Sequence, residues 1–241
     1  MLRRIVGVAL AMCACGPQPG VFRLHDGFTN AYAVVGPEGI AVVDALEPDR
    51  EYWIRDELEL LGIALEDVDV LVLTHGHGDH AGSAAALREL TGAPIVIGTG
   101  DLDMVRRGQV DELHPTGVLG RSRLRRGLVH RSFPGFEPDV VVDDELDLHP
   151  YGVPARMQVM ADGHTTGSAV VRLDSGDVIC GDLVRSSFVL PRTPAEHLFH
   201  DDRDLVHQQL AMLVDDGAGW FWPGHGAPLS APRIERWLRR F

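Results

Sequence analysis

A dense run of metal-binding side chains follows an apolar segment of the chain. Residues Val68 to Leu73 are almost all apolar, which is typical of a strand buried on both faces. The segment leads into Thr74-His75-Gly76-His77-Gly78-Asp79-His80 and then into a helical pattern that Gly92 ends. Alternate residues of an extended loop project to the same side, and the two glycines allow the loop to turn tightly. Because imidazole and carboxylate are good ligands for zinc and similar metals, the run predicts a metal site at the end of a strand.

Three later segments each place one further candidate ligand beside a glycine at the end of an apolar run. These residues are His164 in Gly163-His164-Thr165-Thr166-Gly167-Ser168, Asp182 after the run that ends at Cys180, and His225 in Pro223-Gly224-His225-Gly226. A single histidine beside a glycine is usually structural, but the repetition of one context carries more weight than the number of histidines. We therefore predict that these residues join the first loop around metal.

Apolar runs and turn residues outline strands and helices in two similar halves. The first half has predicted strands at 21–24, 31–35, 40–43, 68–73 and 95–97 and predicted helices at 49–61 and 81–90. The second half has predicted strands at 157–160, 169–173, 178–180 and 220–222 and predicted helices at 205–214 and 234–241. The first three strands should form an antiparallel meander, and the whole pattern favours two sheets with helices outside. Residues 100–150 fit least well, and we expect them to be a long connection or an inserted lid.

The four motifs, in this order, resemble the metallo-β-lactamase superfamily, and the resemblance runs from about Val21 to the C-terminus. It implies an α+β fold, namely a four-layer αβ/βα sandwich with metals at one edge between the two sheets. It also implies two Zn²⁺ ions, with iron or manganese as the alternatives. The implied ligands are His75, His77 and His164 for the first metal, Asp79, His80 and His225 for the second, and Asp182 as the bridge between them.

The resemblance implies hydrolysis by a hydroxide that the metals activate, with Asp79 as the catalytic residue that accepts or passes on a proton. The expected substrate is a small ester, thioester or lactone. The alternatives are a phosphodiesterase, a mononuclear-iron oxygenase on the same fold, and a metal-binding scaffold without turnover. Several relatives fit less well: only sixteen residues follow His225, where glyoxalase II-like proteins carry a glutathione-binding domain. Zinc β-lactamases usually lack an aspartate like Asp182, and the lactonase tyrosine is not found after it.

The charge balance limits the partners of the chain. Acidic residues number 35 and basic residues 22, which gives a net charge of -13 and disfavours nucleic acid as a partner. Every basic residue is an arginine, so the chain has no lysine to form a Schiff base or to bind phosphate. The arginines between Arg121 and Arg131 are expected to form a solvated face, or a rim that attracts an anionic substrate. The expected partner is a small molecule, and the oligomeric state stays open.

The first twenty residues predict export. Arg3 and Arg4 precede an apolar run that ends near Cys13 and Cys15, as in a lipoprotein signal, with Cys15 as the better candidate for acylation. We therefore expect residues 1–20 to be a signal and tether, and residues 21–241 to be the hydrolase domain. The protein would be periplasmic or held at a membrane by this lipid anchor, or cytoplasmic if the signal is spurious. Removal of the segment leaves Cys180 as the last cysteine, so no disulfide is expected within the core.

A few other residues have two interpretations. Asp44 ends a predicted strand and either orients a metal ligand or serves as a plain turn residue. Ser168 is expected to be structural rather than a nucleophile, and Cys180 to be an inert core residue. The other histidines have no ligand-like context, although three of them lie in a stretch that borders the active site in the family. These three are His197, His200 and His207.

Overall fold

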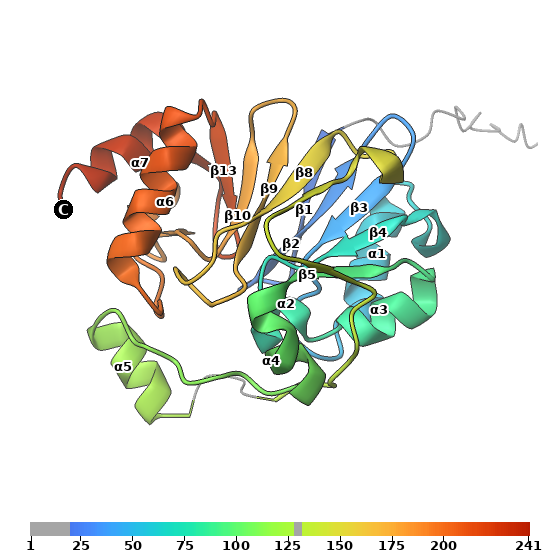
Figure 1. Cartoon of the computed structure of the whole chain (residues 1–241), viewed down its shortest axis with the longest axis horizontal. Coiled ribbons are helices and arrows are strands. Elements are labelled where there is room, and N and C mark those ends of the chain that lie inside the picture. The colour runs from blue at the N-terminus through green and yellow to red at the C-terminus, as the bar shows by residue number, and fades with distance from the viewer. Residues whose placement is uncertain (1–19, 128–131) are drawn as a thin grey trace, which may run out of the picture.

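Two six-stranded sheets pack face to face in this computed structural model, which describes residues 20–127 and 132–241, and helices cover both outer sides (Figure 1). The first sheet has the strand order β1-β2-β3-β4-β5-β6. Its strands are β1 (Gly20–His25), β2 (Asn30–Val35), β3 (Ile40–Val43), β4 (Val70–Val72), β5 (Ile95–Gly98) and β6 (Val140–Val142). The first three strands pair antiparallel, which confirms the predicted meander, and β3 to β6 pair parallel.

The second sheet has the order β14-β13-β10-β9-β8-β7. Its strands are β7 (Glu145–Asp147), β8 (Ala155–Val159), β9 (Ala169–Leu173), β10 (Val178–Gly181), β13 (Trp220–Pro223) and β14 (Leu229–Ser230). A separate hairpin pairs β11 (Arg185–Ser186) with β12 (Pro194–Ala195). Strands β10 and β13 run parallel, so the residues that follow them emerge at the same edge of the sheet.

Seven helices complete the described part of the chain. They are α1 (Glu51–Leu60), α2 (Gly78–Ala81), α3 (Ala84–Thr91), α4 (Leu102–Arg107), α5 (Val118–Arg125), α6 (Arg203–Asp215) and α7 (Ala231–Leu238). Single 3-10 turns occupy Leu65–Asp67, Thr99–Asp101 and His149–Tyr151. Figure 1 shows α1 and α3 beside the first sheet, α6 and α7 beside the second, and α5 apart from both below α6.

The alternation of side chains along the strands divides the core into layers. In β2, Ala31, Ala33 and Val35 face the cluster of buried residues under α1 and α3, whereas Tyr32 and Val34 face the cluster between the sheets. A third cluster joins the second sheet to α6 and α7. Strands β2, β3 and β4 are buried on both faces and are therefore apolar almost throughout, as the sequence predicted for the run that contains β4. The predicted four-layer α+β sandwich is therefore confirmed.

Glycine ends the helix that follows the ligand-rich loop. Gly92 has a φ of 75°, and its N–H donates to the Arg88 carbonyl oxygen at 2.8 Å, which caps α3 where the sequence predicted an end. The predicted helix over 81–90 is nevertheless two helices, α2 and α3. A Cβ on Gly82 between them would lie 2.4 Å from the Pro48 nitrogen, so the chain packs tightly at this joint.

Residues 100–150 hold more regular structure than the sequence analysis predicted. The segment contains α4 and α5, and it ends in β6 and β7, which join the first and the second sheet respectively. The interpretation as a long connection or an inserted lid did not include these helices and strands. Three residues are too few to show a clear alternation of apolar and polar side chains. The position of β6 is set by its pairing with β5, in which Val140 lies opposite Val96.

The predicted export signal lies outside the described residues, as do His130 and Arg131. The signal, its acylated cysteine and the domain boundary at residue 20 therefore stay predictions. Within 20–127 and 132–241, no helix combines the length and the apolar character that crossing a bilayer would require.

Candidate metal centre

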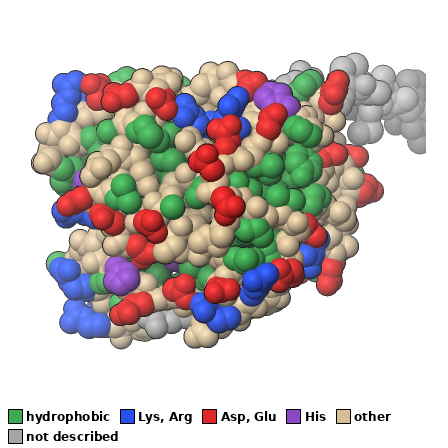
Figure 2. Space-filling view, viewed as in Figure 1, with side chains coloured by type: hydrophobic (Ala, Val, Ile, Leu, Met, Phe, Trp, Pro, Cys, Tyr) green, Lys and Arg blue, Asp and Glu red, His purple; other side chains and the backbone are tan. Residues whose placement is uncertain are grey.

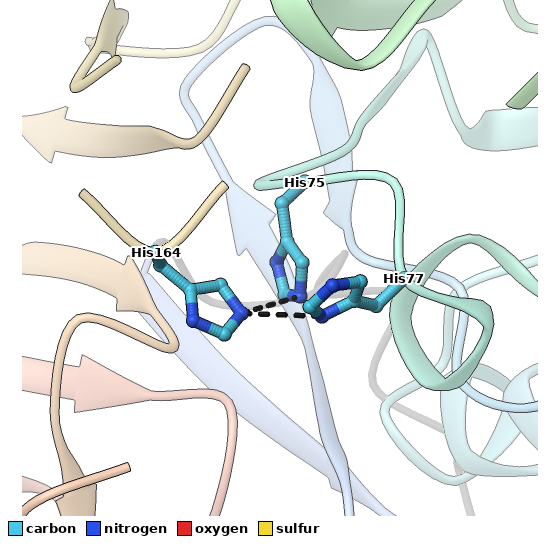
Figure 3. A group of neighbouring side chains, drawn as sticks. All are labelled: His75, His77 and His164. Atoms are coloured by element: carbon cyan, nitrogen blue, oxygen red, sulfur yellow. Dashed lines mark hydrogen bonds between the residues drawn. The ribbon is translucent and has the colours of Figure 1, made fainter. Parts of the chain in front are cut away.

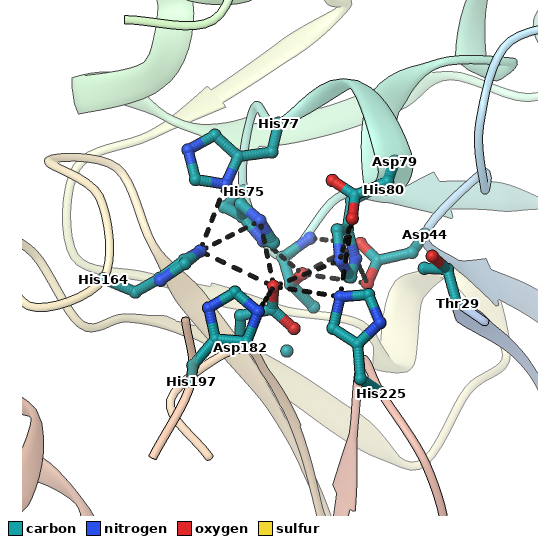
Figure 4. A network of polar contacts seen from close by, with 12 residues as sticks. Thr29, Asp44, His75, His77, Asp79, His80, His164, Asp182, His197 and His225 are labelled. Atoms are coloured by element: carbon teal, nitrogen blue, oxygen red, sulfur yellow. Dashed lines mark hydrogen bonds and ion pairs between the residues drawn. The ribbon is translucent and has the colours of Figure 1, made fainter. Parts of the chain in front are cut away.

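All seven residues that the motifs predicted come together at one edge between the sheets (Figure 4). They arrive from five places in the chain. His75 and His77 lie in the loop after β4, Asp79 and His80 in α2, His164 between β8 and β9, Asp182 after β10, and His225 after β13. This edge collects them because each ligand-bearing segment follows the end of a strand. All of these residues except Asp79 are buried.

Three histidines form the first group (Figure 3). His164 Nε2 lies 3.2 Å from His75 Nε2 and 3.2 Å from His77 Nδ1. The three nitrogens thus face a common point from three sides, with their side chains at most 8% exposed. Neighbouring ligand atoms on one metal ion lie at similar separations, so the group could hold a cation.

The second group joins one carboxylate to two histidines. His225 Nε2 lies 3.4 Å from Asp79 Oδ2, and His80 Nε2 lies 4.0 Å from the same oxygen. Asp182 stands between the two groups. Its Oδ2 atom lies 3.4 Å from the Nε2 atoms of His80 and His225, 3.7 Å from His164 Nε2 and 3.9 Å from His75 Nε2. This position between the groups is what a bridging carboxylate requires.

Asp44 orients two of these histidines. His80 Nδ1 lies 2.9 Å from Asp44 Oδ2, and the Thr74 hydroxyl donates to the same carboxylate. His75 Nδ1 lies 3.1 Å from the Thr74 hydroxyl oxygen, which accepts its proton because its own proton goes to Asp44. Both histidines therefore carry their proton on Nδ1 and turn the Nε2 lone pair inward. Asp44 is 1% exposed and contacts both Thr74 and His80, so it orients candidate ligands rather than serving as a plain turn residue.

Backbone carbonyl groups orient two further histidines. His164 Nδ1 lies 3.0 Å from the Phe199 carbonyl oxygen, and His225 Nδ1 lies 3.0 Å from that of Phe28. A carbonyl oxygen only accepts hydrogen bonds, so the proton of each ring belongs on Nδ1. The Nε2 atom of each ring is then left with a lone pair that faces the centre of the cluster, as metal binding requires.

Buried polar atoms without hydrogen bonds support the same conclusion. Histidine nitrogens lie 3.1–3.9 Å from Asp182 Oδ2 as ion-pair contacts. None of them has the geometry of a hydrogen bond, so among the described residues both oxygens of Asp182 and His80 Nε2 are without a hydrogen-bond partner. Leaving a buried carboxylate in this state is costly unless a positive charge compensates it. A divalent cation on each side of Asp182 would satisfy all three atoms, so the donor set fits a pair of metal ions.

The titration of the histidines fits this charge balance. Burial, together with the neighbouring imidazoles, lowers the pKa of His75 and His164 well below its usual range, which keeps both rings neutral as ligands. Burial acts in the same direction on His225, but the charges and hydrogen bonds of Asp182 and Asp79 together outweigh it and raise the pKa of His225 to about 10. Without metal, protons on such rings compensate the carboxylates, and bound cations would replace these protons.

Asp101 connects two of the ligand loops, and the sequence analysis did not single it out. Its carboxylate accepts hydrogen bonds from Gly76 N at 2.7 Å, the Thr165 hydroxyl at 2.8 Å and Gly167 N at 2.8 Å. The loop of His75 and the loop of His164 are thereby held to one buried side chain. A Cβ on Gly167 would lie 2.3 Å from the Asp101 nitrogen, so this approach requires glycine. The sequence feature that could have pointed to Asp101 is its position as an acidic residue shortly after the predicted strand at 95–97.

Two of the histidines that bordered the predicted site in fact belong to the cluster. His197 Nε2 lies 3.1 Å from Asp182 Oδ2, and its ring stacks on His225 with 5.3 Å between centres. His200 Nδ1 lies 3.3 Å from His164 Nδ1. His207 instead packs against the rings of Trp237 and Phe241, away from the cluster. The sequence does not show which of these three histidines belong to the cluster, because their neighbours in space come from distant parts of the chain.

Ser168 has a structural role, as predicted. Its hydroxyl oxygen accepts a hydrogen bond from Thr165 N at 2.9 Å and lies 2.8 Å from the Thr165 hydroxyl. Because the Thr165 proton goes to Asp101, the Ser168 proton goes to Thr165. The serine therefore supports the loop that carries His164 rather than facing a base.

The buried Cys180 leads to a chemical prediction. It is 0% exposed, and burial raises the pKa of its thiol well above the usual range. In a variant with Cys13 and Cys15 replaced by serine, Ellman's reagent is expected to leave the folded protein unlabelled over hours. One thiol per chain should react at once in guanidinium chloride. Rapid labelling without denaturant would contradict the buried position of this residue.

A cleft opens above the cluster. The space that it encloses, counted together with the open solvent at its mouth, is about 530 Å³. Its lining consists of ligand-type residues at the base and of apolar and charged side chains at the sides. The lining residues are Phe28, Glu47, His77, Asp79, Val110, Leu113, Arg123, Asp182, His197, Leu198, Phe199 and His225. The candidate metal centre is therefore open to a ligand from one side.

Known sequences that resemble this chain belong to a metallo-hydrolase superfamily or are described as metal-dependent hydrolases. Residues 25–225 match the family described as the metallo-beta-lactamase superfamily. A metal-dependent hydrolase of Shouchella clausii is 29% identical over 111 residues, which are 46% of this chain and 48% of that protein. A metal-dependent hydrolase of a Geobacillus species is 32% identical over 105 residues, which are 43% of this chain and 46% of that protein. The matches thus span about half the length of these curated relatives.

Solved structures share the arrangement of sheets and helices. A metallo-beta-lactamase of Cronobacter sakazakii aligns with a TM-score of 0.66 at 18% identity, over 94% of this chain and 90% of that one. A subclass B3 metallo-beta-lactamase of Bradyrhizobium japonicum aligns with a TM-score of 0.64 at 17% identity, over 94% and 89% of the two chains. At such identities the likeness concerns the fold alone.

Proposed function

The chain belongs to the metallo-β-lactamase superfamily, and from this premise we propose that it is a hydrolase that uses two zinc ions to cleave a small ester, thioester or lactone. One observation carries the proposal. Two complete groups of candidate ligands lie side by side and share Asp182, whose buried oxygens have no hydrogen-bond donor among the described residues. A scaffold that had lost its activity would be expected to have lost a ligand as well.

The proposed ligands divide between the two ions as the family motifs imply. The first ion would be held by His75, His77 and His164, the second by Asp79, His80 and His225, and both by Asp182. When bound, such ions supply Lewis acidity and lower the pKa of water to about 7. Asp44 and the carbonyl groups of Phe28 and Phe199 keep the ligand nitrogens turned inward.

The side chains of the cleft supply the remaining chemistry. Asp79 is the more exposed of the two ligand-type carboxylates that line the cleft, with 28% of its side chain exposed. Burial opposes ionisation, but His80 and His225 hold the pKa of Asp79 below its usual range, so it can take up a proton from the nucleophile only transiently and then pass it to the leaving group. His197 also lines the cleft and faces Asp182, where it can hold a substrate oxygen or a water molecule in place.

Elemental analysis combined with a substrate panel tests this proposal. The full chain should contain close to two zinc ions and should hydrolyse at least one class among aryl esters, thioesters and lactones. Removal of the metal with a chelator should abolish the activity, and zinc should restore it. One iron per chain with oxygen uptake would support an oxygenase instead, and cleavage of phosphodiesters alone would support a phosphodiesterase. If zinc-loaded protein hydrolysed no substrate of the panel, the result would support the alternative of a metal-binding scaffold without turnover.

Export is a separate proposal that rests on the N-terminal sequence. We propose that residues 1–20 direct the chain across a membrane and that Cys15 becomes the lipid-bearing residue. Mass spectrometry of the protein from its native host is expected to find a mature chain that begins at this cysteine. An intact Met1 would contradict the proposal.

A further inference from the structure

His197 lies at the ligand cluster although it belongs to none of the four sequence motifs. It comes shortly after β12, and its ring stands beside that of His225, with both rings turned toward Asp182 (Figure 4). On the face shown in Figure 2 little histidine is visible, because the rings of the cluster are buried, and His197 itself is 6% exposed. A buried imidazole needs a partner for each of its two nitrogens.

A backbone carbonyl group determines which nitrogen of His197 carries the proton. His197 Nδ1 lies 3.2 Å from the Phe199 carbonyl oxygen, which lies 3.0 Å from His164 Nδ1 as well. A carbonyl oxygen has two lone pairs and only accepts hydrogen bonds, so it can serve both rings, and the proton of a neutral His197 belongs on Nδ1. The Nε2 atom is then left with a lone pair, as in the predicted ligands His164 and His225.

This lone pair lies close to a carboxylate. His197 Nε2 is 3.1 Å from Asp182 Oδ2, whereas the predicted ligands His80 and His225 have their Nε2 atoms at 3.4 Å. The contact does not have the geometry of a hydrogen bond, because Asp182 Oδ2 has no hydrogen-bond partner among the described residues. Two acceptors so close together repel each other unless a cation lies beside both. Ligand atoms of Asp182, His197 and His225 all lie within 4.8 Å of one another, so these three residues can share one ion.

The segment that precedes α5 holds the backbone of His197 in place. The Thr116 hydroxyl donates to the His197 carbonyl oxygen at 2.5 Å, and Thr116 N donates to the Leu198 carbonyl oxygen at 3.0 Å. His200 N donates to the His114 carbonyl oxygen at 3.0 Å. The side chain of His197 is thus positioned by contacts outside the cluster, as a preorganised ligand requires.

We propose that His197 is an additional ligand of the second metal ion, beside Asp182 and His225. This inference rests on the proposed two-ion centre and adds a ligand to it. The second ion would then have one protein ligand more than the first. Because a catalytic metal needs an open position, a substrate oxygen would find that position at the first ion.

Cobalt binding tests the role of His197 without reference to turnover. A histidine bound to Co²⁺ gives a strongly shifted ring N–H signal in the proton NMR spectrum, and this signal disappears in D₂O. The full chain with two Co²⁺ ions is expected to show one such signal more than the five predicted histidine ligands account for. His197→Phe keeps a ring beside His225 but has no nitrogen, so it should lack that signal, and its affinity for the second ion should fall by about tenfold or more. The matched control is His207→Phe, which alters a histidine that packs away from the cluster and should retain every signal and both affinities.

Chemical rescue and the substrate panel separate the possible results. In His197→Gly, free imidazole is expected to restore the affinity for the second ion, because it can occupy the space of the missing ring. Two Co²⁺ ions without the additional signal in wild type, or equally tight binding of both ions in His197→Phe, would overturn the inference and limit His197 to holding water or substrate. A wild-type chain that shows the additional signal but hydrolyses nothing on the panel would contradict the hydrolase proposal and support this ligand role.

Discussion

Replacing Asp182 by alanine is expected to reduce the metal content from two ions per chain to one or none and to remove activity with it. The reason is that Asp182 Oδ2 lies within 3.9 Å of nitrogens from both ligand groups, so one side chain would serve both of the proposed ions. Loss of a residue that merely supports a ligand lowers metal affinity or activity by about 10–100-fold, and loss of a shared ligand should exceed that. Elemental analysis and kcat/KM on the best substrate of the panel measure both effects.

Two further variants make the result specific to the bridge. Asp182→Asn keeps the volume of the side chain but removes its charge, and it should lose metal nearly as completely. Asp56→Asn changes an exposed aspartate on α1 and should retain both ions and full activity. Circular dichroism should give the same secondary structure for all three. If Asp182→Ala kept two ions per chain, the bridging role would be wrong.

Asp101→Asn is expected to weaken both metal binding and the fold. The amide replaces one accepting oxygen by an NH₂ group, which must then face a backbone N–H of Gly76 or Gly167. A buried donor without an acceptor costs about 1–3 kcal/mol in the free energy of unfolding. Because the same carboxylate fixes the loops of His75 and His164, zinc affinity should fall by about 10–100-fold.

Urea denaturation and competition with a zinc-binding dye measure the two effects. The matched control is Asp103→Asn, because that side chain lies on the neighbouring turn and is 82% exposed. It should change neither the stability nor the affinity. An Asp101→Asn protein that binds zinc as tightly as wild type would contradict the positioning role, even if its stability were lower.

The sequence predicted most of the fold because buried strands and helix ends leave local patterns. The run from Val68 to Leu73 contains β4, and Gly92 ends α3 as expected. The short strands β6 and β7 were missed because three residues cannot show alternation. Their pairing is decided by partners elsewhere in the chain.

By itself, the sequence determined the chemical types of the ligands and their positions at strand ends, since glycines and apolar runs are local properties. Only the tertiary structure decided which further residues serve the site. Asp44 touches Thr74 and His80, and Asp101 touches Gly167, all across long separations in the chain. The local pattern of apolar and polar residues does not predict such contacts, because they form only when the ends of separate strands meet at one edge of the fold. The same reason explains why His197 joins the cluster while His207 packs elsewhere.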